Sequence, residues 1–593
     1  MSGQAWFTLG VIAVMIAALA RDRVAPAFAL LAANLTLLLG GVITTEEALA
    51  GFSNPAPLTV AALFVVARAV EKTGALEPIL RGTLGHRPGR RLALLRFLAP
   101  VAGASAFLNN TPIVAMLAPQ VADWANKRGA SVSSYLMPLS FATILGGTVT
   151  LIGTSTNLVV SGLMVDAGMA PIGMFEITRI GLPVMALGLG VIVLLSPIVL
   201  PNRRGARRQF EEELREYVFT SRVVAGGPLD GKSVEEGGLR NLEGLFLVEI
   251  ERDGQVLAPA APTTLLRGGD RLLFTGRVDM ARDVQGMRGL VSTEHNHALD
   301  FNSGDHTFFE AVVSGASALV GKTLKEVEFR SRYQAAVLAI HRAGQRIHAK
   351  LGEVPLREGD TLLLVSDRDF GRRWRDRSDF LLVSHLGGTP APRGGGKSIF
   401  VGAVMLAIVV VAGAGLLPIL HAALIGALLL VAANILTPGE ARSAVDLDVL
   451  IVIAAAFGVG TAIERSGLAD LIAAYIVGGF EAWGPGGVLF AIALATIILT
   501  EVITNNATAV LIFPIGLAAA GDMGLDPRPF AFAITVAASL SFLTPIGYQT
   551  NTMVYGPGGY RFGDYFRLGA PLTLIAIAAI VILIPVFWPL RPQ

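Results

Sequence analysis

Long apolar stretches alternate with short polar loops at both ends of the chain, and one polar region separates the two sets. The first set covers residues 6–20, 24–43, 57–70, 92–118, 135–165 and 178–200, and the second covers 399–416, 418–437, 447–463, 486–518, 528–555 and 568–588. A helix needs about 20 mostly apolar residues to cross a bilayer. The pattern therefore predicts a polytopic α-helical membrane protein. No basic segment precedes the first stretch, so we interpret it as a membrane helix rather than a cleaved signal.

The two apolar regions resemble each other in sequence. The stretch AVEKTGAL (69–76) matches AIERSGLA (462–469) at an offset of 393 residues. Further along, LIGTSTNLVVSG (151–162) matches PIGYQTNTMVYG (545–556) at an offset of 394. Similarity at a nearly constant spacing indicates that one membrane unit is duplicated.

The basic residues orient the predicted helices. Loops rich in Lys and Arg lie at 21–23, 81–96, 126–129 and 202–208. Cytoplasmic loops carry an excess of these residues, and all four loops share one side if residues 92–118 form a re-entrant hairpin. The repeats, 1–201 and 398–593, then each cross the membrane five times. An odd number gives the halves opposite orientations, the inverted-topology repeat typical of secondary transporters.

The polar middle region, residues 202–397, is predicted to be cytoplasmic and is itself duplicated. LDGKSVEE, VEIERDGQ and LRGGDRLLFTG recur as LVGKTLKE, LAIHRAGQ and LREGDTLLLVS, each 90 residues later. We expect two small α/β domains at 206–292 and 298–386, followed by a Gly-rich linker at 387–397. Neither domain contains G-x-G-x-x-G or a P-loop, so no dinucleotide or nucleoside triphosphate site is expected.

Composition excludes several classes of protein. Of 593 residues, 53% are hydrophobic and 16% charged, whereas soluble domains carry about 25% charged residues. The chain has no cysteine, which rules out disulfides, thiolate metal sites and thiol catalysis. The predicted spans contain no convergent Ser/His/Asp set, metal cluster or carboxylate pair, so an enzyme is not expected. Nothing points to a cofactor or to nucleic acid.

Polar residues interrupt four of the apolar stretches. FLNNTPIVAMLAPQ (107–120) and VITNNATAVLIFPI (502–515) predict two hairpin tips, and GGTVTLIGTSTN (146–157) and LTPIGYQTN (543–551) predict two unwound helices. Backbone without helical hydrogen bonds is tolerated in a membrane only where it lines a cavity or is buried in protein. Helix N-termini attract anions, and freed carbonyls suit a small hard cation. Together the four interruptions predict one composite site near the membrane midplane.

Two plainer interpretations accompany this one. Asn, Thr and Ser in membrane helices often only bond neighbouring helices, although duplication of all four motifs at matched spacing favours a site. Glu501 lies beside the second tip, and an intramembrane carboxylate is a candidate for function. It could take part in ion coupling or bond a neighbouring backbone segment, and we favour the second role.

The motifs resemble those of the divalent-anion:sodium symporter family. FLNNTPIVAMLAP and LTEVITNNATAVLIFP are similar to its paired Ser-Asn-Thr signatures, and GGTVTLIGTSTNLVVSG and TPIGYQTNTMVYG to its unwound helices. The middle region resembles two tandem regulator-of-potassium-conductance C-terminal (TrkA-C-like) domains. The combination resembles the branch of sulfate or general anion permeases. The resemblance implies a homodimer in the cell inner membrane.

In that family the tips and breaks jointly bind the anion and flanking sodium ions. The resemblance implies anion contacts from Asn109, Asn110, Thr111, Thr154, Ser155, Thr504, Asn505, Asn506, Gln549 and Thr550. It implies sodium contacts from Asn110, Gly153, Asn157, Asn505, Thr508, Thr544 and Asn551. The sequence departs from the family pattern at Asn109 and Thr504, where Ser is usual. Ser155 and Gln549 stand at or near positions where carboxylate transporters often carry Pro, which favours a smaller oxyanion such as sulfate.

The resulting hypothesis is sodium-coupled symport of a small divalent anion by alternating access. A negative membrane potential opposes anion entry by about 2.3 kcal/mol per charge per 100 mV, so a dianion needs coupled cations. A small molecule bound to the cytoplasmic domains would regulate transport. The alternatives are a sodium-coupled dicarboxylate symporter and a proton-coupled transporter that uses Glu501. A channel or potassium-uptake subunit is less favoured, since no T-V-G-Y-G run is present.

Overall fold

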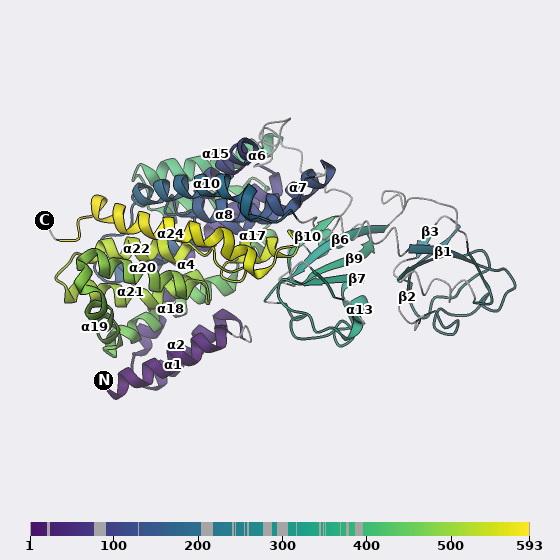
Figure 1. Cartoon of the computed structure of the whole chain (residues 1–593), viewed down its shortest axis with the longest axis horizontal. Helices are drawn as coiled ribbons and strands as arrows, with labels where there is room; N and C mark the ends of the chain where they lie inside the picture. Colours follow the sequence, from purple (N-terminus) through teal and green to yellow (C-terminus); the bar gives the residue numbers. More distant parts are fainter. Residues whose placement is uncertain are drawn as a thin grey trace.

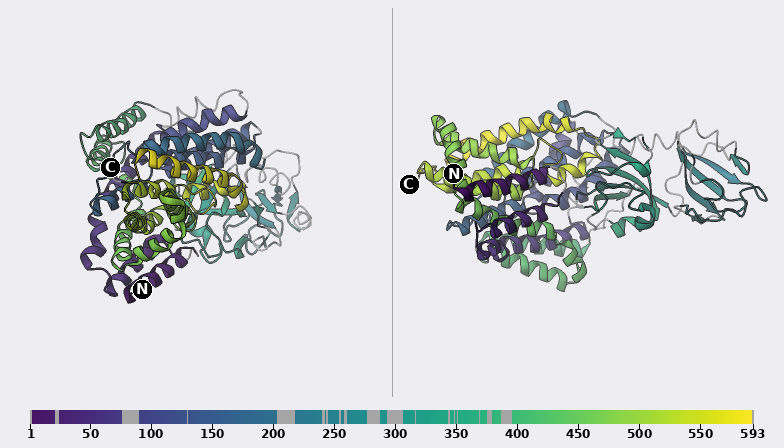
Figure 2. Two further views of the ribbon diagram at one scale, coloured as in Figure 1. Left: turned by 60° about the vertical axis from the view of Figure 1, so that its left-hand side comes forward. Right: turned by 90° about the horizontal axis from the view of Figure 1, so that it is seen from below.

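The chain forms a helical body with a β-rich insert at one end (Figure 1). This computed structural model describes residues 2–20, 24–75, 90–128, 130–202 and 395–591 of the helical body. Within the insert it describes residues 218–239, 242, 245–253, 255–257, 260–276, 287–292, 306–315, 317–342, 345–347, 349, 351–367, 369–374 and 379–385. Both described ends of the chain lie at the end of the body away from the insert (Figures 1 and 2).

The two halves of the helical body contain matching series of helices. The first has α1 (Gly3–Ala20), α2 (Pro26–Leu39), α3 (Thr45–Ser53), α4 (Pro55–Thr73), α6 (Arg90–Ser105), α7 (Asn110–Lys127), α8 (Leu136–Gly147), α9 (Ser155–Asp166) and α10 (Thr178–Val199). The second has α15 (Gly396–Gly413), α16 (Ile419–Ala432), α17 (Pro438–Ala444), α18 (Leu447–Arg465), α19 (Leu468–Phe480), α20 (Gly484–Thr500), α21 (Asn505–Asp522), α22 (Pro527–Ser539), α23 (Gln549–Tyr555) and α24 (Phe562–Phe587). Six described helical segments are long and apolar enough to span a membrane.

Three of these helices are absent from the sequence prediction. The short helices α3 and α17 begin at the equivalent capping boxes Thr44/Glu47 and Thr437/Glu440, and this Thr-x-x-Glu pattern is a known sign of a helix start. Helix α19 has only 13 residues and follows Gly467, whose positive φ turns the chain sharply. A search for 20-residue stretches therefore passes over it. The predicted linker at 387–397 lies mostly outside the described residues, and helix α15 begins at Gly396 rather than at 398.

The halves pack against each other through equivalent helices. Helix α2 lies on α18 and α16 lies on α4, while α10 packs along its own counterpart α24. Two ion pairs also connect equivalent positions of the two halves in this crossed way. Lys72 Nζ lies 2.6 Å from Glu440 Oε1, and Arg465 Nη2 lies 2.8 Å from Glu47 Oε1. Each pair joins the end of a long helix in one half to a capping-box glutamate in the other, as expected for halves related by a two-fold axis.

The insert contains two five-stranded antiparallel sheets with the same topology. In the first, β1 (Val218–Val223), β2 (Leu245–Arg252), β3 (Gln255–Leu257), β4 (Arg271–Gly276) and β5 (Leu290–Ser292) are arranged β3-β2-β4-β1-β5. In the second, β6 (His306–Val313), β7 (Ala335–Arg342), β8 (Gln345–Arg346), β9 (Thr361–Asp367) and β10 (Phe380–His385) are arranged β8-β7-β9-β6-β10. Matching ion pairs, Arg252–Asp270 and Arg342–Asp360, are each 2.7 Å long. The 90-residue repeat therefore corresponds to two units of like structure.

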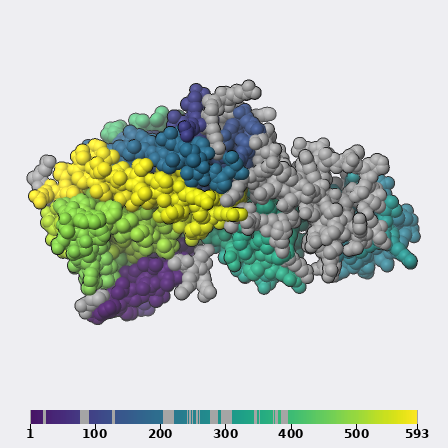
Figure 3. Space-filling model, viewed as in Figure 1, coloured from purple at the N-terminus to yellow at the C-terminus, as the bar shows by residue number. Residues whose placement is uncertain are grey.

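The second unit of the insert packs against the helical body, and the first lies beyond it (Figures 2 and 3). Val312 of β6 and Leu382 of β10 belong to the same buried hydrophobic cluster as the membrane helices. The loop before β9 lies against α23, where Gly359 faces Thr552 and Tyr555. Strand β10 also contacts α7. The second unit therefore contacts one helix from each half.

Candidate transport site

Four interruptions of helix occur where the sequence predicted them. Residues 106–109 separate α6 from α7, and residues 501–504 separate α20 from α21. Residues 148–154 separate α8 from α9, and residues 540–548 separate α22 from α23. We call the first two segments, with the helix starts that follow them, the tips, and the other two the breaks. The N-termini of α7, α9, α21 and α23 consequently all begin at these polar segments.

Each tip is fixed by the same hydrogen bonds. Ser105 Oγ lies 2.6 Å from Asn110 Oδ1 and 2.8 Å from the carbonyl oxygen of Thr143. Thr500 Oγ1 lies 2.9 Å from Asn505 Oδ1 and 2.7 Å from the carbonyl oxygen of Ala538. The single proton of each hydroxyl is shared between its two acceptors. In both halves a hydroxyl at the end of one hairpin arm orients the asparagine and ties the tip to the helix that precedes the break.

The breaks are also built alike. Asn157 Nδ2 donates to the carbonyls of Gly147 (3.2 Å) and Thr150 (2.8 Å). Asn551 Nδ2 donates to the carbonyls of Ser541 (3.0 Å) and Thr544 (3.3 Å). Each asparagine thus binds carbonyls that the unwound backbone has freed, and its own oxygen points elsewhere. Asn157 Oδ1 is buried without a hydrogen-bond partner among the described residues, and Asn551 Oδ1 accepts from Ser140 Oγ (2.7 Å).

The tip of each half meets the break of the other half. Thr111 Oγ1 of the first tip donates to Gln549 Oε1 of the second break (3.1 Å). The equivalent residues, Asn506 of the second tip and Ser155 of the first break, are joined at 3.2 Å. Asn110 Nδ2 also donates to the hydroxyl of Tyr548 (2.8 Å). The four segments therefore form one polar centre shared by both halves.

The structure brings together most of the residues predicted for the site. Asn110, Thr111, Ser155, Asn506 and Gln549 take part in the contacts between halves. Thr550 lies at the same centre, since its hydroxyl lies within hydrogen-bond distance of Ser140 Oγ (2.9 Å). Thr504 Oγ1, Asn505 Nδ2 and Thr508 Oγ1 are buried without hydrogen-bond partners among the described residues. Asn109 and Ser155 line a small cavity whose other walls are mostly apolar residues of α4, α9 and α15.

The remaining predicted residues are backbone or buried positions within the breaks. Gly153 packs so closely on the carbonyl of Gly147 that a side chain would not fit, because a Cβ would lie 2.5 Å from that oxygen. Thr154 lies within hydrogen-bond reach of Tyr548, and the hydroxyl of Thr544 contacts the carbonyl of Glu501 (3.4 Å). All the predicted residues therefore lie on the tips and breaks, whereas their roles toward ligands stay predictions.

Sequence reasoning missed four polar residues of this centre: Ser105, Thr500, Ser140 and Tyr548. Ser105 and Thr500 each precede a tip asparagine by five residues, so a comparison of the two repeats position by position could have found them. Ser140 sits in an apolar helix, and Tyr548 has no aromatic counterpart, since Thr154 stands at the equivalent position. Tyr548 lies within the predicted break, but only the fold shows that its hydroxyl meets the first tip and that Ser140 meets the second break.

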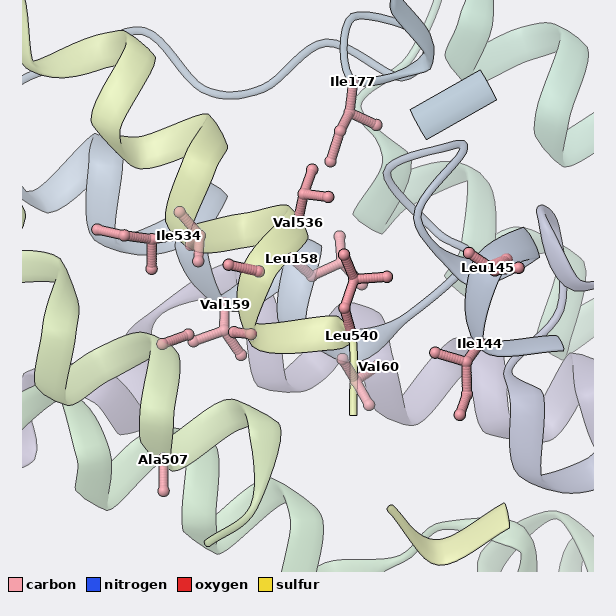
Figure 4. Close-up of a cluster of buried hydrophobic side chains, with 14 of the residues drawn as sticks. Val60, Ile144, Leu145, Leu158, Val159, Ile177, Ala507, Ile534, Val536 and Leu540 are labelled. Atoms are coloured by element: carbon pink, nitrogen blue, oxygen red, sulfur yellow. The ribbon is translucent and has the colours of Figure 1, made fainter. Parts of the chain in front are cut away.

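Buried aliphatic side chains from several helices and the second break form one cluster (Figure 4). Val60, Leu158, Val159, Val536 and Leu540 converge there from three different helices and a break. Two glycines fix the breaks from outside. Gly181 of α10 lies against the carbonyl of Thr148, and its counterpart Gly569 of α24 lies against the carbonyl of Phe542, each without room for a Cβ atom. Dry, tightly packed surroundings strengthen polar contacts within them.

A charged contact joins the halves at the end of the body away from the insert. Arg528 Nη2 lies 2.8 Å from Glu176 Oε1, and Arg528 Nη1 donates to the carbonyl of Ala170. Burial raises the pKa of Glu176, but hydrogen bonds from Gly173 and Arg528 and the charge of Arg528 together lower it below its usual value. The contact therefore links the loop after α9 to the start of α22.

Comparison with known proteins gives the family. The family described as citrate transporter (CitMHS) matches residues 11–537. An uncharacterized transporter of Synechocystis is 37% identical over 94% of this chain and 92% of its own length. A putative sulfur deprivation response regulator of Chlamydomonas reinhardtii is 36% identical over 92% of this chain and 95% of its own. Sodium/sulfate cotransporter 1 of the same alga is 26% identical over 95% and 88%. The chain is a multi-pass membrane transporter, not an enzyme, and it belongs to the CitMHS citrate transporter family.

Proposed function

We propose that the protein is a secondary active transporter that carries a small divalent anion, sulfate or a similar oxyanion, together with sodium. The observation that carries the proposal is the polar centre shared by the two halves. There Thr111 bonds Gln549 and Asn506 bonds Ser155 across the halves. A shared centre can change its exposure when one half tilts against the other, which is what alternating access requires.

The chemistry of the centre suits both ions. Four helix N-termini and amide and hydroxyl donors face it, which suits an anion. Hydroxyls and freed carbonyls suit sodium, a small hard cation with oxygen ligands. The anion would be contacted by Asn109, Asn110, Thr111, Thr154, Ser155, Thr504, Asn505, Asn506, Gln549 and Thr550. Sodium would be contacted by Asn110 and Asn505 of the tips together with Gly153, Asn157, Thr508, Thr544 and Asn551.

The arrangement of the halves supports an inverted-topology repeat, and the protein would lie in the cell inner membrane. The exchanged contacts of α2 with α18 and α16 with α4 are those of two units related by a two-fold axis. The basic loops favour a cytoplasmic insert, and both described chain ends lie at the opposite end of the body (Figure 1). The insert would then be a pair of TrkA-C-like domains at 206–292 and 298–386. The working unit would be a homodimer.

The proposal is tested by uptake into proteoliposomes that contain the purified protein. Radiolabelled sulfate, succinate, citrate and phosphate are offered with an inward sodium gradient, with equal sodium on both sides, or with a proton gradient instead. We expect sodium-driven sulfate uptake to exceed uptake without a gradient by about tenfold or more. Sodium-driven succinate or citrate uptake without sulfate uptake would favour the dicarboxylate alternative, and uptake driven only by protons would contradict sodium coupling.

We further propose that the insert regulates transport through its contact with α23. Gly359 and Thr361 of the second unit lie against Thr552 and Gly556, and α23 begins at Gln549 of the polar centre. A cytoplasmic small molecule that binds the insert would alter transport only if it favours one arrangement of this contact over another.

A reversible cross-link tests this contact. A Cβ at Gly556 would lie 3.2 Å from Thr361 Cβ, so a small outward shift would reach the about 3.5–4.5 Å spacing of a disulfide, and the chain has no cysteine of its own. In Thr361→Cys/Gly556→Cys, oxidation is expected to lower uptake at least about fivefold, and reduction to restore it. Each single-cysteine variant under the same oxidant is the control. A fully cross-linked protein that transports at its reduced rate would show that the contact is only structural.

A further inference from the structure

Glu501 is the acceptor for the unwound backbone of the second break. Its carboxylate accepts hydrogen bonds from the backbone N–H groups of Phe542 (2.7 Å), Leu543 (2.7 Å) and Thr544 (2.9 Å). The residue is only 6% exposed. Three N–H donors need acceptors on both oxygens, which an ionised carboxylate provides. The carboxylate thus replaces the helical carbonyls that these amides would otherwise bond.

The equivalent position in the first half carries no such group. It is Ala106, although Thr150 still donates to its carbonyl just as Thr544 contacts the carbonyl of Glu501. After α8 the backbone stays partly wound, because Thr148 N donates to the carbonyl of Leu145 (3.3 Å) and Val149 N to that of Gly146 (3.0 Å). Unwinding of the second break is therefore supported by a side chain, and that of the first is limited by its own backbone.

The polar atoms of the second tip also differ from those of the first tip. Thr504 Oγ1 and Thr508 Oγ1 are buried without partners among the described residues, and Thr508 is fully buried. Their counterparts are Asn109 and Ile113. The second tip thus carries two hydroxyl groups and a carboxylate, whereas the first carries none of these at the equivalent positions.

We propose that Glu501 is a positioning residue that keeps the second break unwound and makes the sodium site of the second half stronger than that of the first. This inference rests on the proposed sodium-coupled transport. Through three charge-assisted hydrogen bonds, Glu501 fixes the backbone of Thr544. Its negative charge also favours a cation close to the second tip.

Replacement of Glu501 by Gln tests the inference, because the side-chain amide would turn an N–H donor toward backbone N–H groups. We expect the sodium concentration for half-maximal uptake to rise about tenfold or more, while the half-saturating sulfate concentration at saturating sodium changes less than about threefold. Glu501→Asp, which keeps the charge, should recover part of the sodium affinity. The exposed carboxylate variant Glu481→Gln is the matched control.

Sodium-dependent thermal stabilisation of the purified protein gives a second readout that needs no transport. Sodium should raise the melting temperature of the wild type at concentrations that leave the melting temperature of the Glu501→Gln variant unchanged. Equal sodium dependence of the two proteins would overturn the inference even if sulfate uptake is sodium-driven. Sodium stabilisation that depends on Glu501 would support it even if the transported anion is not sulfate. Proton-driven uptake that is lost only in Glu501→Gln would instead identify a proton carrier and overturn the positioning role.

Discussion

Alanine in place of Asn110 or Asn505 is expected to reduce sodium-driven anion uptake about 100-fold or more. Asn110 accepts from Ser105 and donates to Tyr548 across the halves. Asn505 accepts from Thr500, and its buried Nδ2 has no hydrogen-bond partner among the described residues. Loss of a buried hydrogen-bond partner costs about 1–3 kcal/mol. For Asn110, two such losses correspond to roughly a 100-fold change. For Asn505, one such loss adds to the loss of a proposed ligand of both ions.

Initial uptake rates in proteoliposomes measure the effect, with detergent-solubilised protein checked for a single size and an unchanged helical spectrum. Thr36→Ala serves as a control, because among the described residues its exposed hydroxyl bonds only the carbonyl of Ala32 in its own helix. Transport near the wild-type rate in both asparagine variants would mean that tip backbone, rather than these side chains, binds the ions.

Gly569→Ala and Gly181→Ala are expected to lower uptake by about tenfold or more. A Cβ at Gly569 would lie 2.6 Å from the carbonyl carbon of Phe542, and one at Gly181 would lie 2.7 Å from that of Thr148. The obstructing atoms are backbone, so the breaks themselves must shift. Overpacking of this kind costs about 1–3 kcal/mol, and binding groups tolerate displacements of only about 0.5 Å.

The chain provides matched controls on the same two helices. A Cβ atom added at Gly563 of α24 or at Gly190 of α10 would meet no atom of the described residues within 4 Å. Alanine at either position should leave both uptake and melting temperature close to wild type, and the added helix propensity should be slightly favourable. If all four alanine variants transport alike, close packing of α10 and α24 does not fix the breaks.

Much of the site could be predicted because its interruptions are local features of the sequence. Polar pairs such as Asn109–Asn110 and Asn505–Asn506, together with Gly146 and Gly147, interrupt apolar stretches. Because the interruptions recur at a nearly constant spacing in the two repeats, they indicate a common site rather than chance polar residues. The favoured role of Glu501, bonding to a neighbouring backbone segment, is confirmed by its contacts with residues 542–544.

The partner of each segment could not be read from the sequence. The order of the motifs within one half suggests that a tip belongs with the break of its own repeat, and the closeness of Asn110 to Gly147 agrees with this. The bonds of Thr111 with Gln549 and of Asn506 with Ser155 depend on how the halves pack. The sequence prediction missed helix α19 for a different reason. It searched for apolar stretches of about 20 residues, and α19 has only 13.

The pairing of tips with breaks across the halves also sets the order in which the protein can be completed during synthesis. Asn110 and Tyr548 are separated by 438 residues. The first tip therefore leaves the ribosome long before its partner exists, and both units of the insert are made in between. A newly made first half has a polar hairpin end without its final contacts, so the membrane body can close only when nearly the whole chain has been translated.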